Sequence, residues 1–260
     1  VHNRERLLLD PGHSCYRNLM RALDVGTQAH NTCTFTTVAP LNDPRQEDQF
    51  SIRTLEQTTT GRRSIQDGEF GDPLDRGGRR LLAARHGSVT ALGSEAGRLY
   101  GDPIETFVRF WFLCGEHVLF VVDAITSSQP VRTTWNWLLN NRDGGLELKV
   151  VKPDHCIARR GDAGLKLFHL GTGTLSGPTY AYVHDAYHPL PNQRGEGRPG
   201  SGLRMRWQEH DAGTDRVVAH AIAMDNYGAI KGWHITRSDN RVALVGPWDA
   251  QPWTLEIGTD

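Results

Sequence analysis

The sequence has little of what membrane proteins, nucleic-acid binders or disordered chains need. Its 260 residues carry 29 lysines and arginines against 30 aspartates and glutamates, so the net charge of -1 lacks a nucleic-acid binder's basic surplus. The longest apolar run is interrupted by Arg109, Glu116 and His117, whereas a membrane span needs about 20 mostly apolar residues. The 7 tryptophans, 8 phenylalanines and 6 tyrosines suffice for a core. We predict a folded protein with neither nucleic acid nor membrane as a partner.

Cysteine is also scarce, and its spacing excludes two common kinds of site. The four cysteines form no Cys-x-x-Cys pair, which argues against a zinc ribbon or a thioredoxin-like redox motif. Cys114 lies inside an apolar run and is predicted to be a buried free thiol. Cys15 and Cys33 flank the segment of greatest interest, and a disulfide between them is one alternative.

The chain also lacks an initiator methionine and a signal-peptide pattern. Residues 1–6 are polar and charged after Val1, and they lead into an apolar stretch at residues 7–9. We therefore expect a fragment or processed part of a larger protein. The glycine-rich segments 68–80 and 195–202 are predicted to be exposed loops rather than linkers, so we expect one domain over residues 1–260.

What the sequence does contain is a long succession of short β-type runs separated by turns. Residues 203–207 alternate apolar and basic side chains, as in a half-buried antiparallel strand. No segment sustains a helical period over about three turns. The fold class predicted is all-β, a large antiparallel β-sandwich. The predicted strands cover residues 7–9, 33–38, 51–56, 88–92, 106–113, 118–125, 132–139, 146–151, 165–170, 179–183, 203–209, 216–224, 229–235, 242–245 and 253–257.

Two polar motifs stand at predicted strand ends. Asp10 follows residues 7–9 and precedes a Pro-Gly turn, while His30 and Asn31 open the strand at residues 33–38. A carboxylate and an imidazole that converge at a sheet rim suit a zinc site, or a histidine base oriented by an aspartate. The plainer interpretations are an aspartate that caps its own turn and an ordinary surface histidine.

Short motifs in the first half of the chain resemble the heparinase II/III-like β-sandwich domain. They lie within roughly residues 5–140 and are Leu7-Leu8-Leu9-Asp10-Pro11-Gly12, Tyr16, Ala29-His30-Asn31-Thr32, Phe107-Val108-Arg109-Phe110, a strand ending in Val121-Val122-Asp123-Ala124-Ile125, and Thr134-Trp135-Asn136-Trp137. Members of that family are multidomain lyases that act on acidic polysaccharides such as heparin, heparan sulfate and alginate. The resemblance implies a glycosaminoglycan or another acidic polysaccharide as partner, and location in the periplasm or outside the cell.

The resemblance also implies a metal and a reaction. Asp10 and His30 match two zinc ligands of the family, and its third ligand would fall before Val1. The family's chemistry is β-elimination at a uronic acid, in which a base removes the C5 proton while the carboxylate is neutralised. By this resemblance the catalytic candidates are Tyr16, His30 and Asn31. The family's catalytic α/α toroid is absent from this sequence, so a separate N-terminal helical chain or domain is an expected partner.

A second segment is a candidate for substrate binding. Residues 180–189 are rich in tyrosine and histidine, and Tyr187 and His188 could line a sugar surface because rings stack on sugar faces. Arg194 follows in a small basic loop that could meet an anionic sugar. An edge strand followed by a solvated loop is the plainer interpretation.

The function predicted is that of the β-sandwich part of a polysaccharide lyase, supported by zinc, that cleaves uronate-containing polysaccharide. Three alternatives remain open. The chain could be a non-catalytic carbohydrate-binding sandwich, a β-sandwich hydrolase with paired carboxylates, or a scaffold without chemistry. No carboxylate pair stands out in the sequence, which ranks the hydrolase last.

Overall fold

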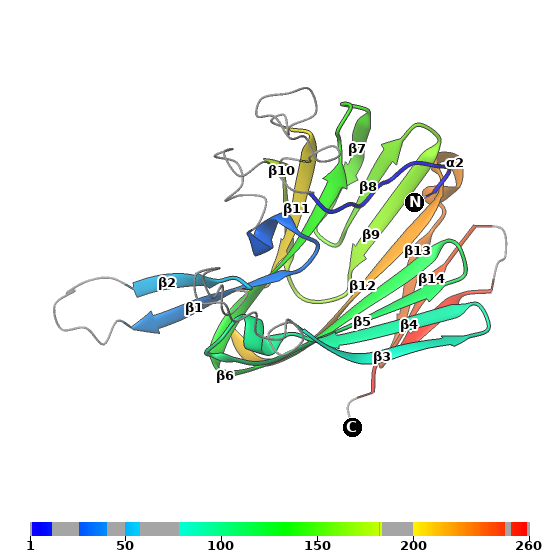
Figure 1. Ribbon diagram of the computed structural model, residues 1–260. Helices are drawn as coiled ribbons and strands as arrows, with labels where there is room; N and C mark the ends of the chain where they lie inside the picture. Colours follow the sequence, from blue (N-terminus) through cyan, green and yellow to red (C-terminus); the bar gives the residue numbers. More distant parts are fainter. Residues whose placement is uncertain are drawn as a thin grey trace, which may run out of the picture.

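The computed structural model describes residues 2–11, 26–40, 50–57, 78–181, 183, 200–247 and 251–258. Strands dominate these residues, which confirms the predicted all-β class (Figure 1). The strands are β1 (Cys33–Pro40), β2 (Phe50–Leu55), β3 (Arg79–His86), β4 (Val89–Glu95), β5 (Ile104–Cys114), β6 (Val118–Asn140), β7 (Leu146–Val151), β8 (His155–Arg160), β9 (Ala163–His169), β10 (Thr174–Ala181), β11 (Gly202–Gln208), β12 (Gly213–Asn226), β13 (His234–Ser238), β14 (Arg241–Val245) and β15 (Trp253–Glu256). The short helices are η1 (Thr27–Ala29), η4 (Gly97–Leu99) and α2 (Tyr227–Ile230), and none in the described part could span a membrane.

The 23-residue strand β6 organises the large sheet. Its first half pairs with β5 and β12, and its second half pairs with β1 and β11, all antiparallel. The sheet therefore has two layers that share β6. One layer has the order β3-β4-β5-β6-β12-β9-β8-β7, and the other has the order β2-β1-β6-β11-β10.

The main core lies where the inward faces of the two layers meet. Trp135 on β6 stands directly opposite Trp207 on β11, and both are fully buried. Since side chains alternate along a strand, the neighbouring even-numbered residues point to the outer face of this layer. Arg204 and Arg206 of β11 are therefore placed outside, as the alternation predicted for residues 203–207 requires.

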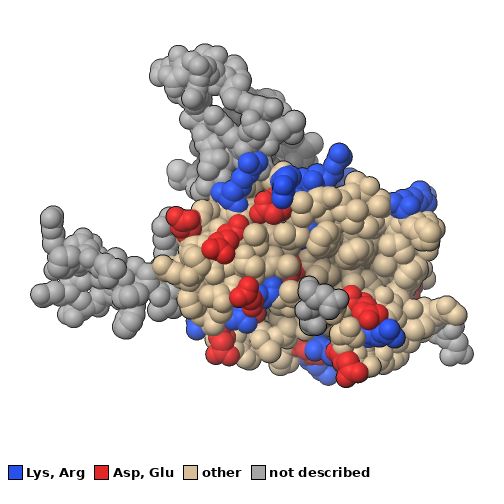
Figure 2. All heavy atoms as spheres, turned by 90° about the horizontal axis from the view of Figure 1, so that it is seen from below, with Lys and Arg blue, Asp and Glu red and all other residues tan. Residues whose placement is uncertain are grey.

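A third layer covers the other side of the β5–β6–β12 region. The three-stranded sheet β13-β14-β15 packs there, and a second buried cluster joins Phe120 and Phe168 to Trp233 and Leu244. On the face shown in Figure 2, acidic and basic side chains are scattered among uncharged ones.

The structure corrects several predicted elements. The predicted strands 118–125 and 132–139 are one continuous strand, β6, because each half finds its own pair of neighbours. Residues 229–235 do not form one strand. Tyr227–Ile230 is the helix α2, which buries Ile230 completely, and β13 begins only at His234.

Three further predictions differ in detail. Residues 7–9 do not form a strand, since the only ladder contact there is a bridge between Leu8 and Leu139. Strand β8 was missed, and so was β3, which includes the end of the predicted loop 68–80. Strand β3 lacked a sequence signal because nearly all its side chains are exposed at the sheet's edge.

The cysteine predictions are resolved in part. Cys114 is a buried free thiol, as predicted. Cys33 is also free and buried, so the alternative of a Cys15–Cys33 disulfide is wrong, and Cys15 itself lies outside the described residues. Burial, followed by the charge of Asp123, raises the pKa of the Cys33 thiol well above its ordinary value.

Candidate functional site

The structure brings the two predicted metal ligands together. Nδ1 of His30 lies 2.7 Å from Oδ2 of Asp10. The side chain of His30 is 34% exposed and that of Asp10 is 67% exposed, so the pair sits at the surface. A hydrogen bond from Nδ1 to the carboxylate fixes the imidazole tautomer and leaves a lone pair on Nε2. The pair therefore has the geometry of a base oriented by an acid.

Asn31 holds the two chain segments that carry this pair. Its Nδ2 donates to the carbonyl of Leu9 over 2.9 Å, and its Oδ1 accepts from the amide of Leu138 over 2.7 Å. Both functional atoms of the side chain are thus engaged with backbone. By fixing Leu9 against β6, Asn31 places the next residue, Asp10, beside His30.

A buried ion pair lies beneath the surface rim formed by Asp10, His30 and Asn31. Arg109 of β5 donates from Nε and Nη2 to the two carboxylate oxygens of Asp123 on β6, over 2.6 and 2.7 Å. Its Nη1 donates to the carbonyl of Asn31 over 2.5 Å. The indole of Trp135 adds a hydrogen bond of 2.8 Å to Asp123. The His30–Asn31 segment therefore rests on a charged network in the core.

Sequence analysis identified the strands of this network but missed the contact between Arg109 and Asp123. A signal existed, because a charged residue at an inward-facing position of an apolar strand needs a partner of opposite charge. Two such residues on consecutive strands form a natural pair. The register places Arg109 directly opposite Asp123.

A second group that sequence reasoning missed lies on the outer face of β11. Arg204 donates from Nη1 to Oε1 of Gln28 over 2.9 Å, and Gln28 lies two residues before His30. Burial, and then the neighbouring charge of Arg206, lower the pKa of Arg204, and Glu56 partly opposes them. Arg204 and Arg206 therefore concentrate positive charge on this face of β11, where Arg204 contacts Gln28.

Several polar atoms on this outer face are buried without a hydrogen-bond partner within the described residues. They are Nε of Arg206, Nε of Arg132 and Oδ1 of Asn136. Asn136 contacts the segment that carries His30, since its Nδ2 donates to the carbonyl of Thr32 over 3.2 Å. Unsatisfied buried polar atoms cost about 1–3 kcal/mol each.

Asp10 and His30 are suited by type to zinc, which takes carboxylate oxygens and imidazole nitrogens. Two ligands do not complete a zinc site, which ordinarily has three or four from the protein. In the part of the chain that the structure describes, no third ligand-type side chain completes a group with this pair. The other predicted site residues, Tyr16, Tyr187, His188 and Arg194, lie outside the described residues.

The fold is similar to the β-sandwich found in heparinase III structures, which confirms the resemblance seen in the sequence. A heparinase III structure matches with a TM-score of 0.62 and 12% identity, over 97% of this chain and 34% of that chain. The heparan sulfate lyase HepC from Pedobacter heparinus matches with a TM-score of 0.60 and 13% identity, over 98% of this chain and 36% of that chain. This chain therefore spans about a third of the length of those proteins. No protein-family model and no curated protein matches the sequence.

Proposed function

We propose that this chain is the β-sandwich part of a polysaccharide lyase that cleaves a uronate-containing acidic polysaccharide by β-elimination. The observation that carries the proposal is the position of Arg204, which is bonded to Gln28 next to the turn that presents His30. A positive surface beside an oriented imidazole suits an anionic sugar. Support also comes from the fold, since the similar structures are heparinase III and a heparan sulfate lyase.

Each residue of the rim has a distinct part in the proposed mechanism. Arg204 and Arg206 bind the carboxylate or sulfate groups of the polymer, because guanidinium groups bond such oxyanions in a bidentate manner. His30 exchanges a proton with the sugar through Nε2, while Asp10 holds its ring. Neutralisation of the uronate carboxylate acidifies the C5 proton, and the leaving oxygen takes up a proton as the bond to C4 breaks.

Zinc belongs to this proposal as a supporting ion at the rim. Asp10 and His30 would provide two ligands, and a bound ion would supply positive charge near the substrate carboxylate, with His30 then acting as a ligand in place of its proton exchange. The Asn31 amide would hold the two segments in place in either case. The residues that contribute most of the catalysis in such an enzyme would come from a separate helical chain or domain.

The first experiment measures binding of the purified chain to heparan sulfate and to a neutral polysaccharide of similar length. We expect binding to heparan sulfate alone, weakened about tenfold in Arg204→Ala and in Arg206→Ala. Arg241→Ala is the matched control, since Arg241 is an exposed arginine on the small sheet that pairs with Glu256. Equal binding of both polymers, or equal loss in the control, would overturn the substrate class.

The second experiment follows the ultraviolet absorbance of the unsaturated uronate product, with and without an added helical lyase domain. We expect product only when His30 is intact. His155→Ala is the control, because His155 forms a similar contact of 3.0 Å with Asp154 away from the rim. Selective binding without product under either condition would identify the chain as a carbohydrate-binding module instead.

Elemental analysis tests the zinc part of the proposal separately. We expect the zinc content of His30→Ala to fall by about one ion per chain relative to the wild type, while His155→Ala keeps the wild-type content. An unchanged zinc content in His30→Ala would remove the metal from this rim. The polysaccharide proposal would then rest on Arg204, Arg206 and His30 alone.

A further inference from the structure

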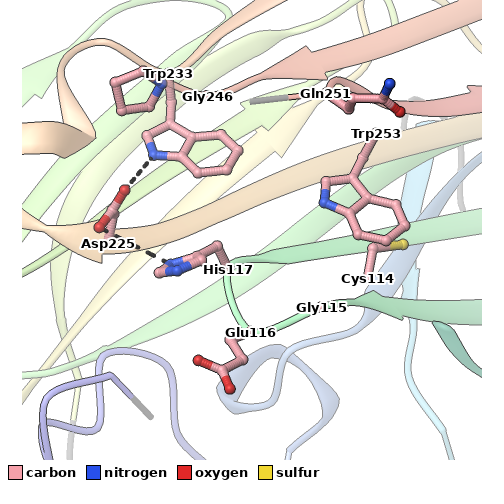
Figure 3. Close-up of a pocket in the computed structure, with 10 residues that line it drawn as sticks. Cys114, Gly115, Glu116, His117, Asp225, Trp233, Gly246, Gln251 and Trp253 are labelled. Carbon is pink, nitrogen blue, oxygen red and sulfur yellow. Dashed lines mark hydrogen bonds and ion pairs between the residues drawn. The ribbon is translucent and has the colours of Figure 1, made fainter. Parts of the chain in front are cut away.

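Three metal-ligating side chains from separate segments meet elsewhere in the fold. His2 comes from the N-terminal turn, His117 from the turn between β5 and β6, and Asp225 from the end of β12. One ligand atom of each lies within 4.8 Å of the other two. No other such group of three occurs among the residues that the structure describes. Figure 3 shows His117 and Asp225 directed toward one another beside Trp233.

The N-terminal turn is held against the end of β12. His2 and Glu5 exchange two backbone hydrogen bonds of 3.0 and 2.8 Å. Nδ2 of Asn3 donates to Oδ1 of Asn226 over 2.5 Å, and Glu5 pairs with Arg160 of β8 over 2.9 Å. These contacts fix His2 next to Asp225, although the two residues lie at opposite ends of the sequence.

His117 and Asp225 each have the outer contacts that are typical of metal ligands. Nδ1 of His117 donates to the carbonyl of Met224 over 2.8 Å, which leaves Nε2 with a free lone pair. The carboxylate of Asp225 accepts from Nε1 of Trp233 over 2.8 Å and from the amide of Asn226 over 2.7 Å. Each carboxylate oxygen keeps a further lone pair, so the group is oriented and can still coordinate an ion.

His2 supplies the independent indication of a ligand. Its Nε2 is buried and has no hydrogen-bond partner within the described residues. Its ring lies 5.5 Å from the ring of His117, between centroids. A buried imidazole nitrogen without a partner is costly, and a metal ion at the centre of the group would satisfy it.

We propose that His2, His117 and Asp225 bind a divalent transition metal, with zinc as the best match. Two imidazoles and one carboxylate are the ligand set of open zinc sites, in which a fourth position takes water or another oxygen. Ligand atoms about 2.1 Å from a tetrahedral ion lie roughly 3.4 Å apart, so small side-chain rotations close the group around the ion. The site is distinct from the Asp10–His30 rim and does not rest on the proposed polysaccharide function.

The fourth position has space beside it. His117 and Asp225 line a pocket of about 350 Å³ between the large sheet and the β13–β15 sheet, together with Trp233, Trp253 and Gln251 (Figure 3). A water or a small oxygen ligand on the metal would be reached through this pocket. The two indole rings make its walls largely apolar.

The test is titration of the chelator-treated full chain with Zn²⁺, and with Co²⁺ as a spectroscopic probe. We expect one ion per chain to remain bound in His30→Ala, with a visible cobalt spectrum typical of tetrahedral coordination. Each added to His30→Ala, His2→Gln and His117→Gln should weaken zinc binding roughly 100-fold and abolish that spectrum. His2→Gln is the safer variant for folding, because His2 lies in a surface turn outside every strand.

His234→Gln is the matched control, since His234 is an exposed histidine whose Nδ1 contacts the carbonyl of Gly232 but which lies outside the group. It should bind zinc as the wild type does. Zinc should also raise the melting temperature of His30→Ala and leave that of the double variant His2→Gln/His30→Ala unchanged. The proposal is overturned if the zinc bound by His30→Ala survives both His2→Gln and His117→Gln, or if His30→Ala removes all bound zinc.

Discussion

Arg109 and Asp123 face one another across β5 and β6, joined by two hydrogen bonds of 2.6 and 2.7 Å in the interior of the sandwich. Their side chains are 5% and 0% exposed. Arg109 donates a third hydrogen bond to the backbone carbonyl of Asn31. The ion pair thus links the main core to the surface rim where His30 lies.

Removal of one partner should be far more damaging than removal of both. Asp123→Asn leaves the Arg109 charge buried without compensation, and we expect a loss of about 3–5 kcal/mol in the free energy of unfolding, measured with urea. The double variant Arg109→Met/Asp123→Leu, which buries no charge, should lose much less. If the double variant is as unstable as Asp123→Asn, the pair contributes through packing rather than charge.

Asn31→Ala should loosen the rim without unfolding the core. It removes two hydrogen bonds to the backbone and leaves the amide of Leu138 unsatisfied, at a cost of about 1–3 kcal/mol. Hydrogen exchange should show faster exchange at Leu138 and at the neighbouring rim. Asn31→Asp keeps the acceptor for Leu138, so it should restore protection there. Unchanged exchange at Leu138 in Asn31→Ala would contradict this role.

Acid should destabilise the fold through a buried histidine pair. Nδ1 of His169 lies 2.9 Å from Nε2 of His220, and the two rings are packed against Trp135. Burial lowers the pKa of His169 to about 4 and lowers that of His220 well below its ordinary value. Between pH 6.5 and pH 4 the unfolded chain therefore binds more protons at these sites than the folded chain does.

Stability should accordingly be complete above pH 6.5 and fall as the pH drops below it. His169 alone should account for a loss of about 2 kcal/mol between pH 7 and pH 5, measured by urea unfolding. The variant His169→Gln/His220→Gln cannot titrate there and should show a shallower dependence on pH. An equal dependence in that variant would assign the acid sensitivity to other groups.

Salt should distinguish direct binding of sulfate or carboxylate groups from a general charge effect. Affinity for heparan sulfate should fall steeply with ionic strength, because bound arginines displace counterions from the polymer. Arg206→Ala should reduce the slope of log affinity against log salt concentration by the amount that one ionic contact contributes. Arg204→Lys should lower the affinity but keep the slope, because lysine retains the charge. A slope that is unaffected in Arg206→Ala would exclude Arg206 from the binding surface.

The sequence predicted the parts of this structure that follow local rules. Alternation at residues 203–207 placed Arg204 and Arg206 on one face of β11. The contact between Asp10 and His30 was predicted from two strand ends and a family resemblance, and their atoms lie 2.7 Å apart. The strand predicted at residues 229–235 was wrong, because Ile230 is buried in a helical turn. The position of that turn depends on packing against distant strands.

The features that escaped prediction depend on long-range contacts. Nothing near His2 in the sequence indicates that it lies beside Asp225, since only the folded sheet brings the N-terminal turn to the end of β12. The same holds for Gln28 and Arg204, which are 176 positions apart. Motif spacing describes neighbours along the chain, whereas both sites form across the fold.

Strand β6 also constrains the order in which the large sheet can form during synthesis. Two of its four neighbours, β11 and β12, begin at Gly202 and Gly213, far downstream of its own residues. During translation, the newly made β6 would leave unpaired backbone edges until those strands leave the ribosome. Pairings so distant in sequence form slowly. The pairing of β6 is therefore complete only after residue 226 has emerged, when both halves of the sandwich can close on the same strand.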